Sequence, residues 1–122
     1  DLVIGWGGCS IPRGQPWWNL TFRIRPERWG KGYASELAAA ARAAAVAVQP
    51  DLPVLAFLVE HNVASRRTIE RLGMRLVWSG PDRSQAGSRR LVYLDRDPNP
   101  EVLADIEQLL GPRGADQHRS PR

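Results

Sequence analysis

The residues with the clearest capacity for chemistry form a short glycine-containing turn at positions 29–35, Trp-Gly-Lys-Gly-Tyr-Ala-Ser. The turn stands between an apolar, strand-like run that ends at Ile24 and a long alanine-rich segment. A turn that leads from a strand into a helix presents unpaired backbone N–H groups to an anion, and the helix dipole adds positive potential there. Gly30, Gly32 and Ala34 leave room for a phosphate to approach the main chain. The segment therefore predicts a phosphate or pyrophosphate site at a helix start.

A second element with polar, site-like residues follows at positions 60–67, Glu-His-Asn-Val-Ala-Ser-Arg-Arg, and leads into Leu-Gly-Met. Asn62 has the short side-chain acceptor that suits a helix N-cap. Gly73 fits the residue just after a helix, with Met74 as the apolar contact of a Schellman-type stop. The sequence therefore predicts a short helix over 63–72, for which Asn62 is at least a cap.

Together these two elements resemble the cofactor motifs of the GNAT superfamily of N-acyltransferases. The string Pro-Glu-Arg-Trp-Gly-Lys-Gly-Tyr-Ala-Ser-Glu, which begins at Pro26, resembles the acetyl-CoA loop of the branch that contains the ribosomal-protein alanine N-acetyltransferases. The superfamily pattern Gln/Arg-x-x-Gly-x-Gly/Ala falls here on Trp29, Gly32 and Ala34, and the Trp is a departure that is common in that branch. Asn-x-x-Ser-Arg-Arg, from Asn62, followed by Leu-Gly-Met is similar to the family's second cofactor element.

The resemblance covers residues 2 to about 96 and implies a fold, an activity and a co-substrate. The fold is α/β, with a mixed sheet inside three layers. The activity is transfer of an acetyl group from acetyl-CoA to a primary amine, either a protein N-terminus or a small molecule, by direct attack in a ternary complex. The cofactor-binding residues that it implies are Phe22, Ile24, Trp29, Gly30, Lys31, Gly32, Tyr33, Ala34, Asn62, Ser65 and Arg66.

The residue that would protonate the departing coenzyme A thiolate follows from the same resemblance. Many superfamily members use a Tyr seven positions after the Asn, and that position is Ile69 here, which has no proton to give. The branch resembled here assigns the role to the Ser three positions after the Asn, which is Ser65. Ser65 equally fits a helix-start residue. In that branch a Glu on the strand often accepts the proton of the amine, and the corresponding position here is Asn19, which cannot usefully accept a proton. A non-catalytic acyl-CoA-binding domain therefore stays open as an alternative.

Composition adds weaker constraints. The chain has 122 residues, 43% of them hydrophobic, which suits one domain, and a net charge of +4. The basic balance suits an anionic cofactor or nucleic acid, but no nucleic-acid motif is present, so a nucleic-acid- or ribosome-binding module is only an alternative.

The sequence has no apolar run long enough to predict a membrane span. The lone Cys9 suits a cytoplasmic protein, and Cys9, His61 and His118 have no partners at metal-ligand spacing, so no metal is expected. A homodimer is an open option.

The pattern of the chain predicts five strands, three helices and a tail. Compared with the family, the first strand and the next two helices are missing, so we expect the C-terminal, cofactor-binding portion of a longer enzyme. The strand at 54–59 should run parallel to the strand at 17–24, because a helix connects them. The expected strands are 2–6, 17–24, 54–59, 75–79 and 90–94, with a loop at 80–88, and the expected helices are 33–48, 63–72 and 99–110. The expected domain organisation is an acetyltransferase domain at 1–97, a C-terminal helix at 98–110 and a disordered tail at 111–122.

Overall fold

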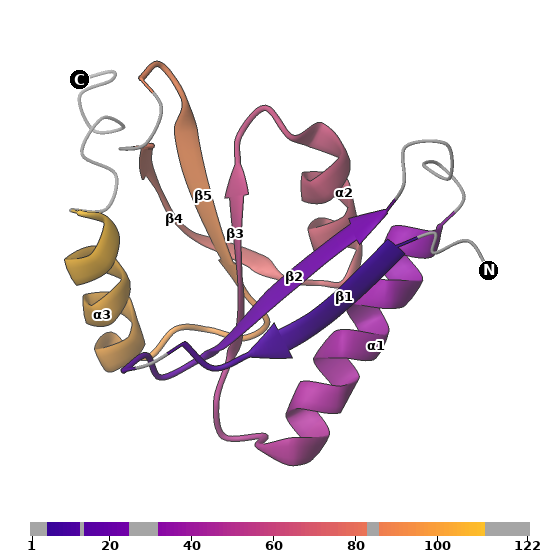
Figure 1. The fold of residues 1–122 in the computed structure, drawn as a ribbon. Helices are drawn as coiled ribbons and strands as arrows, with labels where there is room; N and C mark the ends of the chain where they lie inside the picture. The colour runs from indigo at the N-terminus through magenta and orange to yellow at the C-terminus, as the bar shows by residue number, and fades with distance from the viewer. Residues whose placement is uncertain (1–4, 13, 25–31, 83–85, 112–122) are drawn as a thin grey trace.

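The computed structural model describes residues 5–12, 14–24, 32–82 and 86–111, with the backbone alone at 5–7 and 22–24. In the described part of the chain, five strands form one mixed sheet in the order β1-β2-β3-β5-β4 (Figure 1). The elements, in chain order, are β1 (Gly5–Ser10), β2 (Trp18–Ile24), α1 (Tyr33–Val48), β3 (Val54–Val59), α2 (Val63–Arg71), β4 (Arg75–Pro81), β5 (Arg89–Leu94) and α3 (Pro100–Leu110).

The sheet topology follows the connections between its strands. β1 and β2 pair antiparallel, as do β3 with β5 and β4 with β5. β2 and β3 pair parallel, because α1 carries the chain back to the start of the next strand. The predicted parallel relationship of these two strands is therefore confirmed. α1 and α2 pack on one face of the sheet and α3 on the other, which confirms the three-layer α/β fold (Figure 1).

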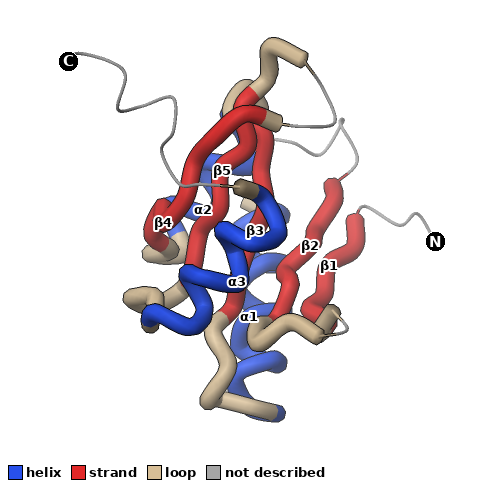
Figure 2. The backbone as a smooth tube through the Cα atoms, turned by 90° about the vertical axis from the view of Figure 1, so that its left-hand side faces the viewer, coloured by secondary structure: helices blue, strands red, loops and turns tan. Residues whose placement is uncertain are grey.

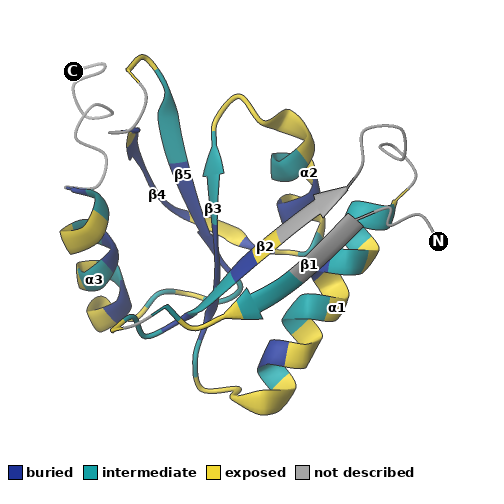
Figure 3. Cartoon of the chain, viewed as in Figure 1, coloured by how far each residue is buried: buried dark blue, intermediate teal, exposed yellow. Residues whose placement is uncertain are grey.

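Each face of the sheet has its own core, because successive strand residues point to opposite faces. Ala56 packs beneath α1 and α2, whereas its neighbour Leu55 packs on the side of α3. This double burial explains why β3 is an unbroken apolar run rather than an alternating one. The buried faces of the helices turn toward the sheet (Figure 3). The largest fully buried side chains include Trp17, Trp78, Leu55, Ile69, Leu94 and Ile106.

The helix ends are fixed by local chemistry, which the sequence predicts for α2; Asn99, expected within the C-terminal helix, is instead its N-cap. Asn62 is the N-cap of α2, and Asn99 caps α3 by accepting the N–H of Val102 at 2.8 Å. After α2, Gly73 adopts a φ of 82° and its N–H donates to the Glu70 carbonyl at 3.0 Å. Met74 then enters the core, as expected for a Schellman-type stop. Among the described helices, none is both long and apolar enough to cross a membrane.

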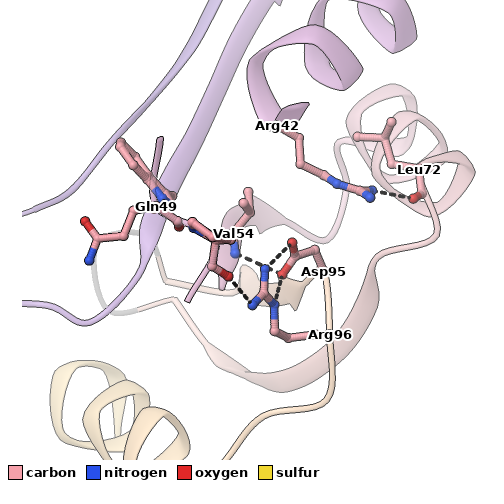
Figure 4. A network of polar contacts seen from close by, with 8 residues as sticks. Arg42, Gln49, Val54, Leu72, Asp95 and Arg96 are labelled. Carbon is pink, nitrogen blue, oxygen red and sulfur yellow. Dashed lines mark hydrogen bonds and ion pairs between the residues drawn. The ribbon is translucent and has the colours of Figure 1, made fainter. Parts of the chain in front are cut away.

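A network of polar contacts joins the start of β3, and the loop before it, to the residues that follow β5 (Figure 4). The Asp95 carboxylate accepts the Val54 N–H at 2.9 Å, and the Asp95 N–H donates to the Val54 carbonyl at 3.0 Å. Arg96 donates to both carboxylate oxygens of Asp95 and to the carbonyl of Pro50. Nearby, Arg42 of α1 donates to the Leu72 carbonyl at 3.0 Å, which ties α1 to the C-terminal end of α2.

Three predicted boundaries are wrong because of a tertiary contact, and the starts of β2, β5 and α3 and the end of α2 each differ from the prediction by one residue. The first strand is Gly5–Ser10 rather than 2–6, because antiparallel pairing with β2 continues through residues of low strand propensity; residues 1–4 lie outside the described part. β4 continues to Pro81, which pairs with Arg89, so the loop at 80–88 is shorter than expected. Gly111, expected in the disordered tail, is buried and its carbonyl accepts the Trp78 indole N–H at 3.1 Å. The tail from 112 lies outside the described residues.

Candidate active site

β2 and β3 pair over only two positions and then diverge. The pairs are Trp18 with Val54 and Asn19 with Leu55. Beyond them a cavity of about 300 Å³ opens between the two strands, lined by Leu20 and Thr21 of β2 and by residues 56–59 of β3. We call this space the β2–β3 cleft. The two strands move apart toward their C-terminal ends (Figure 2).

Two helices begin near the wide end of the cleft. α1 begins at Tyr33, shortly after β2 ends at Ile24, and α2 begins at Val63, shortly after β3 ends at Val59. The strands are parallel, so both connections leave from the same edge of the sheet. Helix N-termini carry unpaired N–H groups and positive potential, and ligands of α/β proteins bind at this edge. The cleft is therefore positioned between two sources of backbone donors.

Asn62 and Ser65 both line the cleft from the start of α2. The Asn62 side-chain oxygen accepts the Ser65 backbone N–H at 3.1 Å, which fixes the orientation of the amide. Among the described residues, neither the Asn62 amide nitrogen nor the Ser65 hydroxyl has a hydrogen-bond partner. The cleft therefore ends at one amide donor and one hydroxyl, and the hydroxyl can give or accept a proton.

The start of α1 contributes the conformation expected of a backbone anion site. Gly32 adopts a φ of 83°, and no atom lies within 4 Å of the position that a Cβ would occupy. The first backbone hydrogen bond here runs from the Glu36 N–H to the Gly32 carbonyl, so the N–H groups of Tyr33 and Ala34 lie in the unpaired first turn. Predicted site residues that lie outside the described part are Trp29, Gly30 and Lys31, together with the side chains of Phe22 and Ile24.

Other residues singled out in the sequence lie away from the cleft lining. Arg66 donates to the Glu60 carbonyl at 3.3 Å and is not among the lining residues. Ile69 is fully buried beneath α1, so this position faces the core. His61 is exposed. Asn19 lies at the closed end of the cleft, and its side-chain oxygen is buried with no hydrogen-bond partner in the described structure.

Near Arg66, a tyrosine is held in the core by α2. The Tyr93 hydroxyl donates to the Glu70 carboxylate at 2.7 Å, and the residue is only 2% exposed. Burial, and then the hydrogen bond to Glu70, raise the pKa of Tyr93 above its ordinary value. Tyr93 does not line the cleft, so we assign it to packing and to the anchoring of α2.

Sequence reasoning missed Arg90, the one charged residue that lines the cleft among the described residues. It lies on β5, directly opposite Val59 of β3, and reaches the cleft through this antiparallel register. No local signal separates it from Arg89 beside it. Its place depends on which strand β5 pairs with and in which register. Within the described part of the chain, no group of three or more His, Cys, Asp or Glu residues could hold a metal ion.

The feature that distinguishes this fold is the pair of parallel strands β2 and β3, which diverge and have the starts of α1 and α2 at their open end. Over residues 1–75 the sequence matches the model of the acetyltransferase (GNAT) domain. The chain belongs to this family. GNAT acetyltransferases transfer acetyl groups to acceptors and generally use acetyl-CoA, so membership identifies the chain as an acetyltransferase domain.

Solved structures share the fold of this GNAT domain. An acetyltransferase from Bacillus anthracis has a TM-score of 0.61 at 23% identity, over 75% of this chain and 57% of that one. One from Agrobacterium tumefaciens has a TM-score of 0.62 at 26% identity, over 77% and 53%. The ribosomal-protein-S5-alanine acetyltransferase from Vibrio fischeri has a TM-score of 0.65 at 15% identity, over 80% and 57%. This chain thus matches just over half the length of each structure. The comparison with curated proteins found no match.

Proposed function

We propose that this GNAT domain is part of an N-acetyltransferase that transfers the acetyl group of acetyl-CoA to a primary amine. The amine attacks the thioester directly while both substrates are bound. The observation that carries the proposal is the β2–β3 cleft, which ends at Asn62 and Ser65 at the start of α2. The family resemblance of the loop before α1 supports the same assignment.

The cleft fits the pantetheine arm of coenzyme A in shape and chemistry. Its walls are largely apolar, with Leu20 on one side and Phe57 and Leu58 on the other. Beyond the two paired positions, the facing edges of β2 and β3 have no partner strand among the described residues. An extended chain with amide groups can hydrogen-bond to such edges as an added strand does. The Asn62 amide nitrogen is a further donor at the wide end.

The first turn of α1 fits the pyrophosphate. The N–H groups of Tyr33 and Ala34 are candidate donors, and Gly32 leaves open space in front of them. In this proposal Trp29, Gly30 and Lys31 complete the loop, with Phe22 and Ile24 on the adjoining strand. Arg66 is a candidate for phosphate contact.

Acetyl-CoA, when bound, supplies the activated acetyl thioester. The transfer forms a bond between the amine nitrogen and the acetyl carbon and breaks the bond between that carbon and sulfur. The nitrogen loses a proton and the sulfur gains one. We assign the proton that the sulfur gains to the Ser65 hydroxyl, which lines the cleft within the first turn of α2, where the helix dipole also favours a developing negative charge. Ser65 then recovers a proton from water. No carboxylate lines the cleft among the described residues, so water is our candidate to accept the amine proton.

Two acceptor classes are proposed for testing: protein N-termini and small-molecule amines. Protein N-termini come first, because the sequence resembles the ribosomal-protein branch at the loop before α1 and at the Asn-x-x-Ser segment from Asn62. We also propose that the protein acts in the cytoplasm, which suits its single cysteine, Cys9.

The proposal is tested with the full-length protein. Calorimetry measures acetyl-CoA binding, and a thiol assay follows coenzyme A release with peptides of varied N-terminus and with small amines. Saturable binding together with turnover of at least one acceptor is the expected result. Acetyl-CoA binding without turnover of any acceptor would favour a non-catalytic acyl-CoA-binding domain. Absence of acetyl-CoA binding would contradict the proposal.

A further inference from the structure

The proposed chemistry leaves Arg90 unused, although it is the one charged residue that lines the β2–β3 cleft in the part of the chain that the structure describes. It lies opposite Val59 on β3 and opposite Gly80 on β4, so its position on the sheet is fixed on both sides. Val59 is the last residue of β3, only a short turn before Asn62. Arg90 is therefore placed at the same end of the cleft as Asn62 and Ser65.

Arg90 enters the cleft from the face of the sheet opposite α1 and α2. Side chains alternate along a strand, so Arg90 shares a face with Val92 and Leu94. Both of these pack in the core on the side of α3. Phe57, which lines the cleft and packs beside that core, lies on the same face. A ligand held at the starts of α1 and α2 would leave this face open to the second substrate.

The neighbours of Arg90 orient its guanidinium but leave most of its N–H donors without a partner among the described residues. One Arg90 nitrogen donates to the Asp82 carboxylate at 3.4 Å, and this is its one hydrogen bond within the described part of the chain. The Asp82 side chain is only 4% exposed, whereas that of Arg90 is 31% exposed. The Asp82 N–H donates to the Ser88 carbonyl at 2.9 Å, which fixes the backbone beside it. A long contact to one nitrogen leaves several N–H groups of the planar fork for a ligand.

We propose that Arg90 is a specificity-determining residue that binds a carboxylate on the amine acceptor. The planar guanidinium matches a carboxylate with two parallel hydrogen bonds, which a neutral amide cannot reproduce. The enzyme then prefers acceptors that carry an acid group close to the reacting amine, either free amino acids or peptides with an acidic residue next to the N-terminus. The inference rests on the proposed function, because it names the acceptor class of the same cleft.

The test compares acceptors that differ only in a carboxylate, using the full-length protein. One arm pairs an amino acid with its amide, and the other pairs a peptide beginning Ala-Glu with one beginning Ala-Gln. We expect the wild type to favour the acid in at least one arm by about tenfold in kcat/KM. Arg90→Gln should bring that ratio close to one. Arg75→Gln is the matched control, since it removes the same charge from an exposed arginine of β4 that pairs with Asp97, and it should preserve the ratio.

Two further measurements keep the test decisive. Arg90→Gln leaves the buried Asp82 carboxylate without its Arg90 contact, so the double variant Arg90→Gln, Asp82→Asn is used if the single variant does not fold. Binding of N-acetyl amino acids and their amides to the coenzyme A-bound protein gives the same acid preference without turnover. Wild-type protein that binds acetyl-CoA but treats acid and amide alike in every arm overturns this inference alone. Wild-type protein that does not bind acetyl-CoA overturns the proposed function with it.

Discussion

The side-chain oxygen of Asn62 accepts the backbone N–H of Ser65 at 3.1 Å, and both residues line the β2–β3 cleft. The oxygen of Asn62 thus caps the helix, whereas its amide nitrogen has no hydrogen-bond partner in the described part of the chain and can donate to a ligand. α3 offers an internal comparison, because Asn99 caps it in the same way, through the Val102 N–H at 2.8 Å, and does not line the cleft. The two caps allow the structural and ligand-binding roles of Asn62 to be separated.

Asn62→Ala and Asn99→Ala should each lower the free energy of unfolding by about 1 kcal/mol, because each removes one N-cap acceptor. Only Asn62→Ala should also weaken acetyl-CoA binding, since only Asn62 lines the cleft. Urea denaturation and calorimetry on both variants measure the two effects. Equal acetyl-CoA affinities for the two variants would show that Asn62 caps the helix and does not bind the cofactor.

Ser65→Ala should lower kcat by about 10²-fold if the Ser65 hydroxyl protonates the thiolate. Acetyl-CoA affinity should change little, because the Asn62 amide and the first turn of α1 remain. Steady-state kinetics and calorimetry on the full-length protein check both statements. Normal turnover by Ser65→Ala would show that the proton comes from water and that Ser65 is a helix-start residue only.

Gly32→Val should weaken acetyl-CoA binding far more than Lys31→Ala, because we assign the phosphate site to backbone donors. Gly14→Val is the control for backbone strain, since Gly14 has a φ of 78° against 83° for Gly32 and both have open space around the missing Cβ. The two valine variants should lose similar stability, about 1–2 kcal/mol or more. The measurement is calorimetry of coenzyme A beside thermal unfolding, and similar coenzyme A affinities for both valine variants would contradict the assignment.

Tyr93→Phe should remove a pH dependence of stability at high pH. The pKa of Tyr93 is higher in the folded state than in the unfolded one, through burial and then the bond to Glu70. Its contribution is therefore fully present below about pH 10, the unfolded pKa, and is lost as pH rises through the folded pKa. Tyr93→Phe should cost about 1 kcal/mol near neutral pH and flatten the alkaline decline. Tyr33→Phe, at the only other tyrosine, should leave that decline in place when both are unfolded in urea across the alkaline range.

Asp95→Ala should destabilise the closed end of the cleft. It removes the acceptor of the Val54 N–H, and the Asp95 side chain is only 5% exposed. An unpaired buried N–H costs about 1–3 kcal/mol. Asp97→Ala is the control, because the Asp97 side chain is 80% exposed and pairs with the exposed Arg75, and surface pairs contribute about 0–1 kcal/mol. Urea denaturation compares the two, and equal losses would contradict the structural role of Asp95.

Local interactions explain why the sequence alone predicts the helices and the motifs they carry. Asn62 caps a backbone group three residues away, and Gly73 completes bonds to the turn before it, so short windows contain the whole cause. α1 begins at Tyr33 and ends at Val48, the predicted bounds. The resemblance to the GNAT family rests on the same short windows, and the predicted helix between the strands at 17–24 and 54–59 is the reason that β2 and β3 were expected to be parallel.

The tertiary structure alone decided what depends on partners distant in the sequence. β1 extends beyond its strand-forming residues because β2 pairs with it, and Gly111 is ordered because the Trp78 indole reaches its carbonyl. Arg90 enters the cleft only because β5 pairs antiparallel with β3 in one register. A slip of one residue would send its side chain to the other face. Strand pairing joins groups across tens of residues, so no local pattern specifies which arginine meets the cleft.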